Sequence, residues 1–278
     1  MDLAFTTPQP PSVIDQAADL RFADLAASLG LDPADRFVGG YVAWEWQRSR
    51  HLFDGLVERI ENLRVLEVGC NVGGTTVVLA ALGARVTAVE PDRELLELAR
   101  ANVARHGLSD RVRLIHVPDT RRLPFAASSF DWASCNSVLE YVPMPSRPAL
   151  LRELDRVLRP GGVLAILGSS NRLWPREEHS GRWLVHYLPR AIDPLVSLAS
   201  PKPIRRGVSP GSLLEALPGY TDELALSRGR RYRELKRRMG APAWKLGFAA
   251  ALGALGLPPG LAAPTLSLAL RKPISSRV

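Results

Sequence analysis

The feature that most constrains the fold is a glycine-rich turn between a short apolar run and a helical pattern. Residues 65–76 read Val-Leu-Glu-Val-Gly-Cys-Asn-Val-Gly-Gly-Thr-Thr. A strand, a turn and a helix start in this order bring backbone amides close to a ligand, and Gly69 and Gly73 allow that approach without a Cβ clash. Asn71 tolerates the positive φ that such a turn can require. The segment therefore predicts a strand–turn–helix unit that binds a ligand at its turn.

Short β-branched runs alternate with amphipathic stretches along the chain, which predicts βαβ units and a parallel sheet. The expected fold class is α/β: a Rossmann-like, doubly wound, mostly parallel seven-stranded sheet with helices on both faces and a C-terminal insertion. The predicted strands are residues 64–68, 85–90, 112–116, 130–135, 163–167, 221–227 and 265–271. The predicted helices are residues 17–29, 41–61, 74–82, 92–106, 146–158, 209–217 and 228–238.

Composition suggests how the chain is divided. Residues 1–35 include a Pro-rich stretch and lack the basic flank and apolar run of a signal peptide, so we interpret them as a leader that is partly disordered. Residues 36–278 are interpreted as one domain. It carries a substrate insertion at about residues 169–208 and a basic and apolar insertion at about residues 228–264.

Charge and cysteine content narrow the possible functions. Cys70 and Cys135 stand outside any CxxC or Cys/His cluster, so we predict no metal site and a cytoplasmic location. The net charge is +8, and between Lys202 and Gly240 ten basic residues stand against four acidic ones. Such a segment is either a solvated helix face or a surface that attracts nucleic acid, anionic lipid or an acidic substrate.

An uncharged stretch follows the basic helix. Residues 246–270 would be long enough to cross a bilayer, but three prolines and four glycines interrupt them. We therefore expect a buried or membrane-surface hairpin rather than a transmembrane helix. The apolar stretch beside basic residues favours a hydrophobic substrate, or a peripheral position at an anionic membrane.

A carboxylate stands at the end of the second predicted strand. Glu90 follows Glu67 by 23 residues, and a carboxylate in this place can accept hydrogen bonds from both hydroxyls of a ribose. The turn reads G-x-N-x-G-G rather than G-x-G-x-x-G. A nicotinamide or flavin cofactor is therefore the weaker interpretation.

With these residues in place, the chain resembles the class I S-adenosylmethionine-dependent methyltransferases, and is most similar to their small-molecule branch. The resemblance covers about residues 63–168. Four sequence motifs match those of the family in the same order. They are residues 66–73, residues 89–92, Asp119 with residues 123–125 and 129–131, and residues 158–162. The resemblance implies S-adenosyl-L-methionine as the cofactor. The contacts it implies are Glu67, Gly69, Asn71, Gly73, Glu90, Asp92, Asp119, Thr120, Asn136 and Ser137.

The resemblance also implies a role for each contact. The glycine turn would line the methionine and the ribose, and Glu67 would hold the methionyl amino end, directly or through water. Glu90 would take the ribose hydroxyls. Asp92 and Asp119 would lie near the adenine, with Thr120 beside Asp119. Asn136 and Ser137 would sit beneath the sulfonium, and Asn71 departs from the glycine that the family often has.

The acceptor side is less well defined by the sequence. Residues 170–183 follow the fifth strand at the carboxyl end of the sheet, where ligands bind in open α/β folds, and they include Glu178 and His179. His179 is a candidate base because its ordinary pKa is near neutrality, although both residues could merely brace the loop. Tyr41, Trp44 and Trp46 are either a lid or helix packing residues.

Several acceptor classes are disfavoured. Base-amine methyltransferases carry Asn/Asp-Pro-Pro-aromatic after the fourth strand, where this chain reads Asn-Ser-Val-Leu-Glu-Tyr at residues 136–141, and no Pro-Cys nucleophile stands there either. A small hydroxylated or lipid-like acceptor, methylated by in-line displacement, is the favoured interpretation. Two alternatives stay open: an RNA methyltransferase that uses the basic segment, and a non-catalytic binding module of the same fold.

Overall fold

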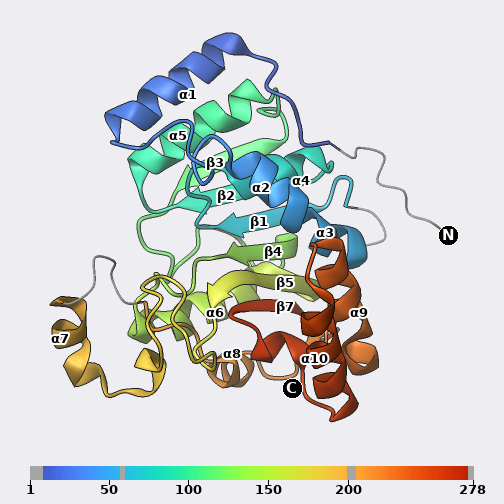
Figure 1. The fold of residues 1–278 in the computed structure, drawn as a ribbon. Helices are drawn as coiled ribbons and strands as arrows, with labels where there is room; N and C mark the ends of the chain where they lie inside the picture. Colours follow the sequence, from blue (N-terminus) through green and yellow to red (C-terminus); the bar gives the residue numbers. More distant parts are fainter. Residues whose placement is uncertain (1–8, 57–59, 199–204, 275–278) are drawn as a thin grey trace.

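A mixed sheet of seven strands forms the centre of the computed structural model, which describes residues 9–56, 60–198 and 205–274 (Figure 1). The strand order is β3-β2-β1-β4-β5-β7-β6, and β7 alone runs antiparallel to its neighbours. The predicted Rossmann-like, mostly parallel, seven-stranded fold is confirmed. The strands are β1 (Arg64–Val68), β2 (Arg85–Glu90), β3 (Val112–His116), β4 (Phe130–Asn136), β5 (Leu158–Ser170), β6 (Thr221–Asp222) and β7 (Thr265–Arg271).

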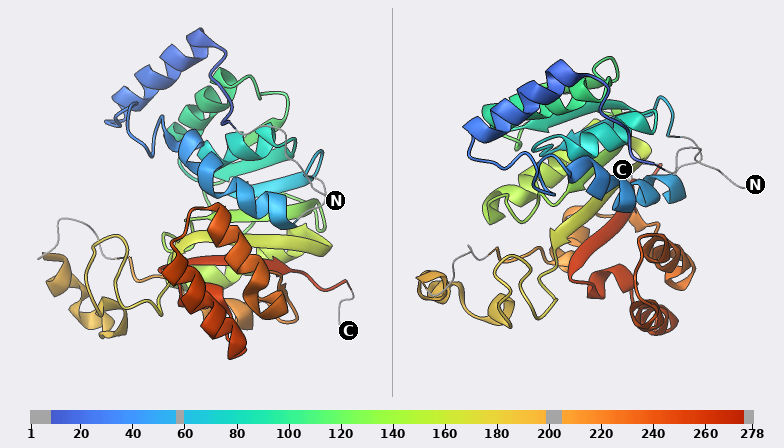
Figure 2. Two further views of the ribbon diagram at one scale, coloured as in Figure 1. Left: turned by 45° about the vertical axis from the view of Figure 1, so that its right-hand side comes forward. Right: turned by 45° about the horizontal axis from the view of Figure 1, so that its top comes forward.

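Helices cover both faces of this sheet, as the two further views show (Figure 2). Contacts join α1 to α5, α2 to α4, and α9 to α10, and α3 reaches α9 across the sheet face. The α-helices are α1 (Gln16–Ser28), α2 (Tyr41–Arg48), α3 (Arg50–Leu56), α4 (Gly74–Ala81), α5 (Arg93–Arg105), α6 (Arg147–Val157), α7 (Asp193–Leu198), α8 (Pro210–Ala216), α9 (Leu226–Arg238) and α10 (Ala243–Ala254).

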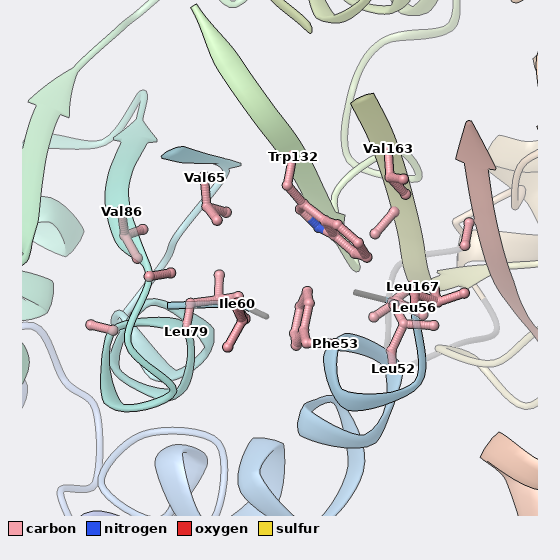
Figure 3. Close-up of a cluster of buried hydrophobic side chains, with 14 of the residues drawn as sticks. Leu52, Phe53, Leu56, Ile60, Val65, Leu79, Val86, Trp132, Val163 and Leu167 are labelled. Atoms are coloured by element: carbon pink, nitrogen blue, oxygen red, sulfur yellow. The ribbon is translucent and has the colours of Figure 1, made fainter. Parts of the chain in front are cut away.

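Side-chain alternation along the strands separates two apolar cores. Val65 of β1 and Trp132 of β4 point to the face covered by α3, α4 and α5, where the ring of Phe53 lies 5.4 Å from that of Trp132 (Figure 3). Leu66 and Ala133, one residue further along each strand, belong to the opposite core, which α6 and α8 cover. Because successive side chains alternate between faces, these central strands are apolar on both sides, as buried parallel strands are.

Two predicted elements are shorter than expected. The helix predicted at residues 41–61 is two helices, divided at Ser49, whose backbone stays helical and whose carbonyl oxygen accepts a hydrogen bond from the backbone N–H of Leu52 three residues on. The second helix ends at Leu56. Residues 57–59 of that prediction lie outside the described residues. The strand predicted at residues 221–227 ends at Asp222, because the carboxylate of Asp222 accepts hydrogen bonds from the backbone N–H groups of Leu224 and Ala269 and turns the chain.

Strand β5 is longer than the predicted strand at residues 163–167. It begins at Leu158, which pairs with Phe130, and the backbone of Gly161 and Gly162 continues the pairing to Lys272 beyond β7. The glycines therefore extend the strand here instead of ending the ladder. The bounds of the other core elements agree with the predictions to within one or two residues.

The segments outside the core also have defined positions. The helix predicted in the leader forms as α1, and it packs on α5 through Phe22 and through an ion pair between Asp19 and Arg105 at 2.9 Å. Residues 1–8 lie outside the described part of the chain, and the domain boundary at residue 35 stays a prediction. The apolar stretch at residues 246–270 contains part of α10, a short turn and β7. Among the described helices, none has the length and apolar character needed to cross a bilayer.

One ion-pair cluster fastens the amino-terminal ends of the central strands. Asp131 of β4 accepts hydrogen bonds from the backbone N–H and the guanidinium of Arg64 at 2.9 and 3.0 Å, and from Arg159 at 2.7 Å. Burial opposes the ionisation of Asp131, but these hydrogen bonds outweigh it and lower its pKa to about 2. The cluster ties β1, β4 and β5 together at the edge opposite the glycine turn.

We expect Asp131→Asn to reduce the free energy of unfolding by about 1–2 kcal/mol at pH 7, a value discounted for partial solvent screening. The folded-state pKa lies below the ordinary value, so the stabilisation is present above about pH 4 and is lost as the pH falls through about 2. Urea unfolding of both proteins at pH 7 and near pH 2 measures it. An equal loss at both values would show that the ionised carboxylate is not the cause.

Candidate active site

The glycine turn lies between β1 and α4, and its backbone has the conformation that the sequence predicts. Gly69, Asn71 and Gly73 have φ values of 72°, 49° and 79°. A Cβ at Gly69 would lie 2.7 Å from a methyl group of Val138, and Gly73 is the N-cap of α4. The turn is therefore closed against the chain after β4, and the backbone N–H groups of Gly69 and Cys70 donate hydrogen bonds to the carbonyl oxygen of Val89 at the end of β2.

Glu90 at the end of β2 holds the turn from the neighbouring strand. One carboxylate oxygen accepts a hydrogen bond from the backbone N–H of Asn71 at 2.8 Å, and the other accepts one from that of Asp92 at 3.3 Å. The residue is only 6% exposed, and burial raises the pKa of Glu90. Each oxygen keeps a further lone pair for a donor such as a hydroxyl group.

Glu67 is buried one residue before the end of β1. Its carboxylate accepts a hydrogen bond from the hydroxyl of Thr76 at 2.6 Å. Burial, together with the charges of Glu45 and Glu90, raises the pKa of Glu67 to about 8, although the bond from Thr76 opposes this. Near neutral pH the group is therefore largely protonated, and a cation placed beside it would favour ionisation.

A hydrogen-bond network on α2 completes the site, and its acidic member was not predicted. The side-chain amide of Asn136, at the end of β4, donates to a carboxylate oxygen of Glu45 at 3.0 Å and to the hydroxyl of Thr75 at 3.0 Å. The hydroxyl of Tyr41 also bonds Glu45, and its ring lies against Gly74, where a Cβ would be 2.3 Å from the ring. The spacing of Tyr41 and Glu45 by one helical turn is the sequence signal that could have found this network.

The sequence left open whether the aromatic residues of α2 form a lid or pack the helix, and the structure shows features of both. Tyr41 covers the glycine turn as a lid residue would. Trp46 is buried in the core beside Val77 and Val78, as a packing residue. Trp44 lies under the guanidinium groups of Arg36 and Arg48 at the surface.

The remaining predicted cofactor contacts are placed as follows. Asp92 is the N-cap of α5 and accepts hydrogen bonds from two backbone N–H groups, so it has a structural role besides the predicted one. Asp119 is exposed and forms a bidentate ion pair with Arg121, in which two guanidinium nitrogens each lie 2.9 Å from a carboxylate oxygen. Thr120 beside it is half-buried. Ser137 has a φ of 53° at the end of β4, against Gly168. Their contacts with a cofactor stay predictions.

On the acceptor side, His179 faces a buried carboxylate. Its Nε2 lies 3.8 Å from an oxygen of Glu140, which is too long for a hydrogen bond but close enough for an ion pair. The carboxylate of Glu140, aided by Glu177, raises the pKa of His179 against the effect of partial burial. The ring of Tyr141 meets the imidazole edge to face at 5.6 Å. Glu140, in the segment after β4, was not predicted as a site residue.

The two glutamates beside His179 differ in their environment. Glu177 is fully buried and accepts hydrogen bonds from the backbone N–H groups of His179 and Ser180 at 3.0 and 2.6 Å, so it shapes the loop. Glu178, which the sequence predicts as a catalytic residue together with His179, is exposed. From the sequence alone the two adjacent residues are equivalent, since burial in an irregular loop has no periodic signal.

The His179–Glu140 pair lies at the same edge of the sheet as the glycine turn. The backbone N–H of Ser170, at the end of β5, is 3.4 Å from a Glu140 oxygen, and Gly168 nearby crowds Ser137. In Figure 1 the arrowheads of β1 and β4 point toward the side on which the insertion lies. The turn, the strand-end carboxylates and a histidine–carboxylate pair thus share one edge of an open α/β sheet, the usual position of ligand sites in such folds.

Comparison with known proteins agrees with this arrangement. Residues 66–166 match the family of methyltransferase domains. The methyltransferase GfsG of Streptomyces halstedii is 40% identical over 126 residues, which cover 43% of this chain and 44% of that protein. A ubiquinone biosynthesis O-methyltransferase of Psychrobacter arcticus is 32% identical over 133 residues, which cover 48% of each. The chain thus spans less than half the length of either relative.

The similarity in fold extends further than the similarity in sequence. The solved structure of an S-adenosylmethionine dependent methyltransferase from Mesorhizobium loti shares 20% sequence identity with this chain. The match covers 82% of this chain and 97% of that one, with a TM-score of 0.52. At this identity the likeness concerns the fold alone.

Proposed function

We propose that this chain, whose core is a class I S-adenosylmethionine-dependent methyltransferase domain, transfers a methyl group to an oxygen of a small hydroxylated or lipid-like acceptor. The observation that carries the proposal is the set of buried carboxylates around the glycine turn. Glu45, Glu67 and Glu90 all have pKa values raised chiefly by burial. Such a site favours a cationic ligand that also carries hydroxyl groups.

The residues present fit S-adenosylmethionine in charge and in shape. Glu90 would accept hydrogen bonds from the ribose hydroxyls, and Glu67 would hold the methionyl ammonium group, directly or through water. Gly69 and Gly73 have positive φ, and a Cβ at either would press against Val138 or Ala99, so only glycine allows the compact turn on which the cofactor would lie. Asn136 and Ser137, at the end of β4, would lie beneath the sulfonium. The cofactor, when bound, supplies a methyl group already activated by the sulfonium charge.

The chain's own contribution to the reaction is alignment and proton removal. In the proposed mechanism the nearby charge of Glu140 favours the tautomer of His179 that has its proton on Nε2, so that Nδ1 has the lone pair that accepts the acceptor hydroxyl proton. S-adenosylmethionine would supply the methyl group and keep the carbon–sulfur electron pair, while His179 would hold the proton taken from the acceptor hydroxyl. Tyr41 and the insertion would keep water from the reacting atoms.

The acceptor class is inferred from the relatives and the surroundings of His179. A ubiquinone biosynthesis O-methyltransferase is among the relatives, which supports an oxygen acceptor with apolar character. The insertion exposes several large apolar side chains beside the histidine, which suits such an acceptor. They are Leu173, Trp183, Leu184, Tyr187 and Leu188.

The proposal is tested by incubating the protein with S-adenosylmethionine labelled in the methyl group and a panel of phenols, quinols and hydroxylated lipids. Label recovered in an acceptor, with a mass increase of one methylene group, supports it. Label transferred to RNA, with none in the panel, would favour the RNA methyltransferase. Tight binding of S-adenosylhomocysteine with no transfer to any acceptor would favour the binding module.

The raised pKa of Glu67 predicts that cofactor binding is coupled to proton release. The carboxyl group is largely protonated below pH 8 in the free protein, and a bound ammonium group favours its ionised form. The affinity for S-adenosylmethionine should therefore rise between about pH 6 and pH 8, with up to about one proton released at pH 7.

Calorimetric titration in two buffers of different ionisation enthalpy measures that proton. Glu67→Gln should remove the release while Thr76 keeps a hydrogen-bond partner. The matched control is Glu97→Gln, a substitution at an exposed carboxylate on α5. If wild type and Glu67→Gln show the same buffer dependence, Glu67 is not the group that ionises.

A further inference from the structure

Helix α10 has an unusual distribution of apolar side chains. Ala249 and Gly253, one turn apart, are buried against α9, and Gly253 lies so close to it that a Cβ would be 2.1 Å from the carbonyl oxygen of Arg228. The opposite face is apolar and exposed. Trp244, Phe248 and Leu255 are 67%, 52% and 75% exposed, and Ala251 lies on the same face at helical spacing.

Basic residues flank this apolar face. Residues 226–254, which include α9 and α10, contain eight basic residues and one acidic residue. Arg228 of α9, whose carbonyl oxygen lies against Gly253, is exposed, and the ammonium group of Lys245 lies 5.4 Å from the Trp244 ring. An exposed apolar stripe bordered by cations is the pattern of a helix that lies in the plane of a membrane surface.

We propose that the outer face of α10, with the cations of α9 beside it, docks this protein on an anionic lipid bilayer. The aromatic rings of Trp244 and Phe248 would enter the headgroup boundary, and the arginines would contact the lipid phosphates. A second copy of the chain is a poorer occupant, because two such strongly cationic hairpins would repel each other across the contact.

The position of α10 in the fold suits an acceptor held in the membrane. Helix α10 and the insertion with α7 lie at the same end of the molecule, opposite α1, in all the views (Figures 1 and 2). In the insertion, Trp183 and Leu195 are also exposed, at 67% and 69%. A bilayer lying along this end of the molecule would meet both α10 and the insertion. This link to the acceptor rests on the proposed function, whereas the docking itself does not.

Vesicle sedimentation, without cofactor or acceptor, tests the docking. The full chain is mixed with vesicles of phosphatidylglycerol and phosphatidylcholine in equal parts, or of phosphatidylcholine alone. We expect pelleting with the anionic vesicles, strongly reduced in about 0.5 M salt. Trp244→Ser with Phe248→Ser should weaken vesicle binding at least about tenfold, since each ring buries apolar area on insertion. Arg228→Gln with Lys245→Gln, at the two cations placed beside α10, should weaken it through the lost charge.

Matched controls are chosen at the other end of the molecule. Leu20→Ser, an exposed leucine on α1, and Arg85→Gln with Arg113→Gln, two exposed arginines on β2 and β3, should leave pelleting unchanged. No pelleting of the wild type, or equal pelleting with both kinds of vesicle, would overturn the proposal. So would a dimer in sedimentation velocity that the Trp244 and Phe248 substitutions dissociate. Because no methyl transfer is measured, failure of the proposed function leaves this result interpretable.

Discussion

His179→Ala is expected to lower kcat for methyl transfer by about 10²- to 10⁴-fold, the range typical for loss of a general base. The imidazole stands at the carboxyl edge of the sheet, and its Nε2 is 3.8 Å from the carboxylate of Glu140. Alanine removes the group that would take the acceptor proton and leaves the cofactor turn untouched. Initial rates with the acceptor found by methyl labelling measure the effect.

The pH dependence separates a base from a bracing residue. Only neutral imidazole accepts a proton, so kcat should rise with pH through the pKa of His179, which Glu140 raises above its ordinary value of 6.5. Glu140→Gln removes the negative charge and should therefore move the pH at which kcat rises to a lower value. It should also lower kcat, because the orientation of the imidazole is lost. If Glu140 had a purely structural role, the substitution would change kcat without changing the pH at which kcat rises.

Two measurements make the His179 result decisive. Affinity for S-adenosylhomocysteine and the unfolding temperature should stay close to wild type, since His179 touches neither the turn nor the sheet core. The turnover of Glu178→Gln should be measured beside that of His179→Ala, because Glu178 is the other predicted catalytic residue and is exposed in the same loop. Unchanged turnover of His179→Ala would rule out the base, and a larger loss with Glu178→Gln would transfer the role to that carboxylate.

The positions of the glycine turn and of Glu90 could be predicted from the sequence because they depend on local patterns. Gly69, Gly73 and Glu90 stand at strand ends whose order follows from a simple alternation, and their spacing specifies where they meet. The same reasoning predicted positive φ at Asn71, which is observed at 49°. Strand β6 was predicted too long because a side-chain hydrogen bond of Asp222, rather than a pattern, ends it.

The residues that were missed belong to contacts between distant segments. Asn136 and Glu45 are 91 positions apart and are joined by a hydrogen bond that depends on how α2 crosses the sheet. Glu140 and His179 meet only because the insertion folds back over the end of β4. Glu140 lies in an irregular segment, where burial has no sequence period. Glu45 lies on a helix, and its burial depends on how α2 packs against the rest of the chain.

Glu90→Ala is expected to weaken binding of S-adenosylhomocysteine at least about tenfold, or about 1.4 kcal/mol. The carboxylate would be the acceptor for both ribose hydroxyls, and it also fixes the turn through the backbone N–H groups of Asn71 and Asp92. S-adenosylhomocysteine has no sulfonium charge, so the measurement excludes the attraction between the carboxylate and the sulfonium. Isothermal titration calorimetry of both proteins measures the difference.

The double role of Glu90 requires variants that separate contact from folding. Glu90→Gln retains the size and one acceptor oxygen for a backbone N–H, so it should keep the turn closed and still weaken the ribose contact, with a smaller loss than alanine. Glu94→Ala, an exposed carboxylate in the first turn of α5, is the matched control and should bind as the wild type does. If Glu90→Ala binds normally, the ribose lies elsewhere. If the wild type itself does not bind, the cofactor assignment fails, and the carboxylates around the turn must serve a different cation.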